Sequence, residues 1–205
     1  MQRFYHNDKQ QLIQLLSVFN EVSAKYSRKD FDTDIALKAL LDKAAARYKE
    51  GGHTDKESQV RLLQAEIATA ERGIHPETRE RVTTRRSEMR MGILLKVLQT
   101  LEQMLREELT TANNKLQEAR DIVAQILLAG MQGGILEDVV LTKDNNEAEL
   151  QAIWKLLSAD GNIVLGQKRV LMMVSMYDIL LLMDELFALI NQQLQIAPAL
   201  VNSAN

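Results

Sequence analysis

Residues 91–126 read MGILLKVLQTLEQMLREELTTANNKLQEARDIVAQI and contain one glycine and no proline. Apolar side chains recur along this stretch at alternating steps of three and four residues, which places them on one face of an α-helix. The resulting seam consists of Met91, Leu94, Leu98, Leu101, Leu105, Leu109, Ala112, Leu116, Ala119, Val123 and Ile126. Between Leu105 and Leu109 a step of four replaces a step of three, as in a stutter that locally unwinds a coiled coil.

The seam predicts one long helix from Glu77 to about residue 129. Pro76 fits the first turn of that helix, where the missing N–H of a proline costs nothing. The glycines of GMQGG (130–134) are expected to end the helix. A final helix is predicted over about residues 167–196, and the connector at 135–165 would let the two long helices run antiparallel.

Shorter amphipathic segments predict three helices within residues 1–74. We therefore expect an N-terminal short-helix region over residues 1–74 and a long-helix bundle over residues 75–205, with one continuous domain as the alternative. In the connector, NIVL (162–165) follows an Asp-Gly turn and could pair with VVL (139–141) as a tiny β-ribbon. The predicted fold class is all-α, an elongated helical bundle of long, antiparallel, coiled-coil-like helices.

The most apolar stretch is VLMMVSMYDILLLMDELFALI (170–190), which has about the length of a membrane span. Three acids inside it, Asp178, Asp184 and Glu185, oppose its insertion into a bilayer. Polar doublets recur every seven residues, and a methionine-rich apolar seam lies opposite them. This pattern favours a bundle helix with a solvated acidic side, and it leaves release to a membrane or a partner as the alternative.

The residues expected to contact a partner come from this seam and from the arginine-rich stretch RERVTTRRSEMR (79–90). They are Met172, Met176, Met183, Phe187, Arg79, Arg85, Arg86 and Arg90. Methionine side chains suit adaptable contact surfaces, and arginine forks match the geometry of phosphates and carboxylates. The net charge of −3 and the lack of interleaved aromatic residues disfavour nucleic acid as the partner of the arginines. Glu77 and Arg81, four apart, are expected to pair on the helix surface.

The sequence contains no cysteine and no common nucleotide-binding, nucleophile or zinc-protease motif. We therefore expect no enzymatic activity, no cofactor and no metal site. The N-terminus MQRFYHNDKQQ lacks the apolar core of a signal peptide. This predicts a cytoplasmic protein, or one exported without a cleavable signal peptide.

The function expected from these features is that of a non-enzymatic helical interaction or assembly protein. Such an adaptor, scaffold or regulatory subunit presents coiled-coil-type seams to itself or to a protein partner, and we favour a homo-oligomer. One alternative is a membrane-acting helical protein of the pore-forming type that releases the 170–190 helix. A further alternative is phosphate or nucleic-acid binding through the Arg79–Arg90 cluster.

Overall fold

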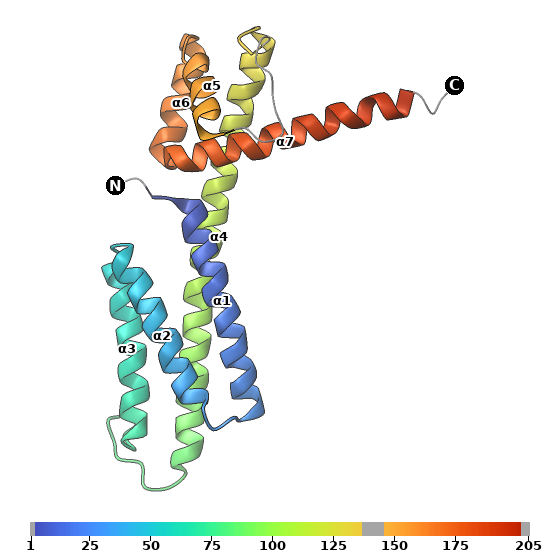
Figure 1. Cartoon of the computed structure of the whole chain (residues 1–205). Coiled ribbons are helices and arrows are strands. Elements are labelled where there is room, and N and C mark those ends of the chain that lie inside the picture. The colour runs from blue at the N-terminus through green and yellow to red at the C-terminus, as the bar shows by residue number, and fades with distance from the viewer. Residues whose placement is uncertain (1–2, 137–145, 202–205) are drawn as a thin grey trace. The chain divides into compact units, whose positions relative to one another are not determined.

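The computed structural model describes residues 3–136 and 146–201, and beyond residue 190 it describes the backbone alone. Within these residues the chain forms seven helices and no strand, which confirms the all-α prediction (Figure 1). The 47-residue helix α4 packs antiparallel against other helices. The helices are α1 (Tyr5–Arg28), α2 (Thr33–Glu50), α3 (Thr54–Glu71), α4 (Arg86–Gln132), α5 (Glu147–Leu157), α6 (Gly161–Met173) and α7 (Met176–Val201).

The chain divides into two compact units. The central unit comprises residues 10–110, and the terminal unit comprises both ends of the chain, residues 1–9 and 111–205. Both boundaries fall inside helices, because α1 and α4 each contribute to both units. The physical basis of the division is that the two halves of α4 bury separate apolar clusters. The domain boundary expected after residue 74 stays a prediction.

In the central unit the chain direction alternates from α1 to α2, α3 and the first half of α4, so that consecutive helices are antiparallel (Figure 1). Leu12 of α1, Tyr48 of α2 and Leu101 of α4 are all fully buried in its core. The α3 helix ends at Glu71, and Gly73 follows its C-cap with a φ of 73°, in the left-handed region that glycine adopts without strain. The Ile74 N–H then donates to the Thr69 carbonyl over 3.2 Å, and this bond closes a Schellman motif.

The segment before α4 corrects the predicted helix start. Residues 74–82 form an irregular turn instead, with an antiparallel bridge between Ile74 and Arg81. The Val82 N–H donates to the Gly73 carbonyl over 2.8 Å, and this bond belongs to a turn rather than to a helix. The predicted helix start at Glu77 is therefore wrong, and α4 begins nine residues later at Arg86. The predicted Glu77–Arg81 pair is wrong as well, because the Glu77 carboxylate pairs with Lys96 at 2.9 Å.

The predicted seam of α4 is buried over most of its length, and it departs from the predicted pattern near Leu109. Met91 and Leu109 are half-buried, whereas Glu108 is only 2% exposed. Glu108 therefore takes the seam position that the apolar pattern had given to Leu109. The irregular step of four in the sequence marks the place where this carboxylate enters the core of the central unit.

In the terminal unit, α5 begins with a capping box in which Asn146 and Glu149 satisfy each other's backbone N–H groups. The α6 helix begins after Asp160, whose side chain accepts hydrogen bonds from two backbone N–H groups of its first turn. The NIVL segment (162–165) lies within α6, so the predicted β-ribbon is wrong. Its other expected strand, VVL (139–141), lies outside the described residues.

The predicted final helix over residues 167–196 is two helices, α6 and α7, separated at Val174 and Ser175. Ser175 and Asp178 form a reciprocal cap at the start of α7. The Ser175 Oγ accepts from the Asp178 N–H at 3.1 Å, and the Asp178 carboxylate accepts from the Ser175 N–H at 3.2 Å. This S-x-x-D pattern provides a new helix start inside the apolar run, so one continuous helix does not form.

Candidate functional site

The four partner-contacting residues predicted from the apolar run lie in very different surroundings in the terminal unit. Met183 and Phe187 are fully buried in its core, and Met176 is half-buried against the same core. Met172 is 80% exposed. In this conformation Met172 alone of the four presents most of its surface to solvent.

The four predicted arginines lie in the central unit, and all are exposed. Arg90 pairs with Asp34, and Arg85 pairs with Glu88 at 3.7 Å. The Arg86 Nε donates to the Val82 carbonyl over 2.8 Å. Arg79 has a φ of 60°, which is uncommon for a residue other than glycine. Three of the four arginines thus already bind groups of the chain itself.

A second exposed apolar residue lies on the same helix as Met172. Leu165 is 68% exposed, and seven residues separate the two, so both lie on one face of α6. Lys168 and Arg169 lie between them and are exposed. Neither cation forms an ion pair with any residue that the structure describes, and α6 contains no acid. We call Leu165, Lys168, Arg169 and Met172 the α6 ridge.

A small groove of about 140 Å³ lies between α5 and α7 in the same unit. Its apolar lining comes from leucines and from Tyr177, which is 48% exposed. Its charged lining consists of two carboxylates, those of Glu147 and Asp184. We call this feature, with Glu147, Leu150, Tyr177, Leu180, Leu181 and Asp184, the α5–α7 groove. The groove combines acidic and apolar side chains, whereas the α6 ridge combines basic and apolar side chains.

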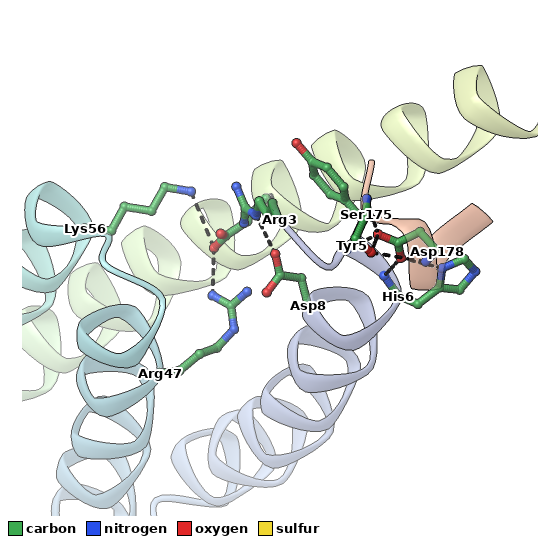
Figure 2. A network of polar contacts seen from close by, with 9 residues as sticks. Arg3, Tyr5, His6, Asp8, Arg47, Lys56, Ser175 and Asp178 are labelled. Atoms are coloured by element: carbon green, nitrogen blue, oxygen red, sulfur yellow. Dashed lines mark hydrogen bonds and ion pairs between the residues drawn. The ribbon is translucent and has the colours of Figure 1, made fainter. Parts of the chain in front are cut away.

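The Asp178 side chain accepts several hydrogen bonds within the terminal unit. Asp178 is 0% exposed, so the interpretation of the acidic doublets as solvated is wrong for this residue. Figure 2 shows Tyr5, His6 and Ser175 converging on its carboxylate. It accepts bonds from the backbone N–H groups of Tyr5 (3.1 Å), His6 (2.9 Å) and Ser175 (3.2 Å), from His6 Nδ1 (2.7 Å) and from Ser175 Oγ (2.7 Å). The buried acid thereby ties the first turn of α1 to the start of α7.

The charge of Asp178 is stabilised by these bonds. Burial by itself raises the pKa of Asp178, but the bonds from the His6 side chain and backbone, from Ser175 and from the Tyr5 backbone outweigh it. The pKa of Asp178 therefore lies below its ordinary value of 3.8, and the group is ionised at neutral pH. Because a carboxylate only accepts hydrogen bonds, His6 Nδ1 carries a proton and donates it to the bond with Asp178.

The central unit contains a second buried polar network, which the sequence pattern did not indicate. Arg47 donates to Glu108 over 3.1 Å, and their side chains are only 8% and 1% exposed. Lys56 approaches the same carboxylate at 3.4 Å (Figure 2). The Arg47 guanidinium also lies over the Tyr48 ring, 5.2 Å from its centroid. These contacts supply the partners that a buried charge requires.

Residues 3–136 and 146–201 contain neither a candidate metal site nor a candidate membrane span. No three His, Cys, Asp or Glu side chains in that part of the chain lie where they could hold a metal ion. No helix there combines the length and the apolar character that crossing a membrane requires. No family model, curated protein or solved structure matches the chain.

Proposed function

We propose that this chain is a non-enzymatic assembly protein that associates with further copies of itself through the α6 ridge. The observation that carries the proposal is the exposed pair Leu165 and Met172, with two cations between them that pair with no described residue. This combination resembles the composition of interface cores, which are enriched in apolar side chains, methionine and arginine. The proposed acceptor is the α5–α7 groove of a second copy.

Charge complementarity favours this acceptor over a second α6 ridge. The α6 helix carries Lys168 and Arg169 and no acid, so two ridges facing each other would repel. The α5–α7 groove instead offers Glu147 and Asp184 beside leucine and tyrosine side chains. Asp184 forms no ion pair with any residue in the described part of the chain, so it is available to a cation from another molecule.

A ridge that binds a different surface on the next copy makes a heterologous contact. Such contacts produce closed rings or open chains rather than twofold dimers. Burial of one leucine or methionine side chain contributes about 1.5–3 kcal/mol, and entropy lost on association opposes it. We therefore expect a weak contact, with a dissociation constant of about 1–100 µM. Its electrostatic part weakens as added salt screens the charges.

The apolar side chains of the α6 ridge should contribute to self-association. In sedimentation velocity from about 1 µM to about 1 mM, the wild-type chain should grow in mass with concentration. Leu165→Ser with Met172→Ser should move that growth at least about tenfold higher in concentration, because both apolar contacts are lost. Fold stability should change little, since both side chains face solvent.

Leu62→Ser is the matched control for this experiment. Leu62 is 66% exposed but lies on α3 of the central unit, which contains neither proposed contact surface. The control should associate as the wild type does. A wild-type chain that stays monomeric over the whole range, or an equal loss of association in the control, would contradict the proposal.

The other two functions considered from the sequence have less support. A membrane-acting mechanism requires release of the 170–190 segment, but Met183 and Phe187 are buried in the core of the terminal unit. Phosphate or nucleic-acid binding through the arginines would compete with the contacts that Arg85, Arg86 and Arg90 already make. No observation favours either function over assembly.

A further inference from the structure

A second groove of the terminal unit, of about 350 Å³, takes no part in the proposed assembly contact. Three segments line it: the first turn of α1, residues 113–120 of α4 and residues 182–185 of α7. Its volume falls within the range of about 300–1,000 Å³ that small-molecule sites occupy. We call it the polar groove, since two leucines are its only apolar lining residues.

Two cations are its most distinctive feature. Lys9 and Arg120 both line the groove and are both half-buried. Neither forms an ion pair with any described residue, although the chain as a whole has more acids than bases. Two cations in one groove, neither of them paired with a described residue, provide charge-assisted donors for an anion from outside. Two cations match the charge of a phosphate monoester better than that of a single carboxylate.

A carboxylate lies on another wall of the same groove. His6 Nε2 is 3.9 Å from a carboxylate oxygen of Glu185, and both residues line the groove. The bond between His6 Nδ1 and Asp178 fixes the ring beside that carboxylate. An ionised carboxylate only accepts hydrogen bonds. Hydroxyl groups of a ligand supply donors to Glu185, whereas a bare anion would be repelled by it.

The remaining lining residues suit the same kind of molecule. Asn113, Asn114 and Gln117 are exposed amides that can both donate and accept. Leu116 and Leu182 are buried and form an apolar patch beside them. The groove thus combines a cationic wall, an accepting wall and neutral amides, as a small hydroxylated anion requires.

We propose that the polar groove binds a small phosphate monoester of a polyol. Lys9 and Arg120 hold the phosphate, and the Glu185 carboxylate accepts from the hydroxyl groups. The inference is independent of the assembly proposal, because none of these residues belongs to the α6 ridge or the α5–α7 groove. Either proposal can fail while the other stands.

Isothermal titration of the full-length chain with glycerol 2-phosphate at low salt tests the cationic wall. Binding should be measurable, and Lys9→Gln or Arg120→Gln should each weaken it about tenfold, because each removes a charge-assisted contact. Lys115→Gln is the matched control, since it removes the same charge from α4 but lies outside the groove, paired with Glu118 at 3.2 Å. It should change the affinity less than about twofold.

Absence of heat and of chemical-shift change with glycerol 2-phosphate up to about 10 mM would overturn the inference. An equal loss of affinity in Lys115→Gln would also overturn it, because the effect would then reflect net charge alone. Should a groove variant fail to fold, chemical-shift changes of the wild-type chain decide the question. They must centre on Lys9 and Arg120 rather than on Lys115.

Inorganic phosphate tests the accepting wall. The wild-type chain should bind glycerol 2-phosphate several-fold more tightly than inorganic phosphate. In Glu185→Gln this preference should shrink, because the carboxylate no longer selects for hydroxyl donors while its repulsion of phosphate is removed. Equal affinity for both ligands in the wild type would contradict the assignment of hydroxyl binding to Glu185.

Discussion

Replacing Glu108 with glutamine should lower the free energy of unfolding of the central unit by about 3–5 kcal/mol. The Glu108 carboxylate is 1% exposed. It forms ion pairs with Arg47 at 3.1 Å and with Lys56 at 3.4 Å. The neutral amide removes the counter-charge that Glu108 supplies to the buried Arg47, and it presents N–H groups to other donors. Urea unfolding followed by circular dichroism measures the loss, which should appear in the midpoint rather than in the slope.

Glu107→Gln is the matched control, because Glu107 is the exposed neighbour on the same helix. Its effect should stay within about 0.5 kcal/mol. The double substitution Arg47→Met with Glu108→Leu should recover most of the loss, since apolar pairs often replace buried ion pairs without net cost. A loss below about 1 kcal/mol in Glu108→Gln would show that the pair does not stabilise the central unit.

Asp178→Asn should have the second large effect, a loss of about 2–4 kcal/mol in the stability of the terminal unit. The carboxylate accepts from backbone and side-chain donors of Tyr5, His6 and Ser175. An asparagine side chain has an NH2 group in place of one carboxylate oxygen. This group cannot accept hydrogen bonds, so the donors that face it lose their acceptor. Asp121→Asn on the exposed face of α4 is the control, and it should change stability by less than about 0.5 kcal/mol.

The same residue predicts a pH dependence. The pKa of Asp178 is lower in the folded chain than its ordinary value of 3.8. Its contribution is therefore complete above about pH 4 and is lost as the pH falls through the folded pKa. The stability difference between the wild type and Asp178→Asn should be constant near neutral pH and shrink below about pH 4. A difference that stays constant down to about pH 2 would contradict the assigned role of the charge.

Most of the helices could be predicted because their signals are local. The apolar period of α4 predicted its buried face, and the capping box of Asn146 and Glu149 is a local signal for the start of α5. The break between α6 and α7 also had a local signal, the S-x-x-D pattern of Ser175 and Asp178. The apolar run around these two residues favours one continuous helix, which is why the break was not predicted.

The candidate sites depend on contacts that sequence periodicity does not contain. His6 and Asp178 are 172 positions apart, and a carboxylate in an apolar helix is equally compatible with a solvated side or a buried cap. Glu108 occupies the irregular step of the α4 seam, but its burial depends on Arg47, which lies 61 positions away. Such pairings follow from tertiary packing, which selects among locally acceptable alternatives.

Association between two charge-reversed variants is the most direct test of the proposed contact between the α6 ridge of one copy and the α5–α7 groove of the next. One variant carries Lys168→Glu with Arg169→Glu, which makes its ridge acidic, and the other carries Glu147→Lys with Asp184→Lys, which makes its groove basic. Each variant alone should sediment as a monomer at concentrations where the wild type associates, because like charges then meet. An equimolar mixture should regain association, since the acidic ridge of the first variant fits the basic groove of the second. A mixture that remains monomeric, or variants that each associate as the wild type does, would contradict assembly through the α6 ridge and the α5–α7 groove.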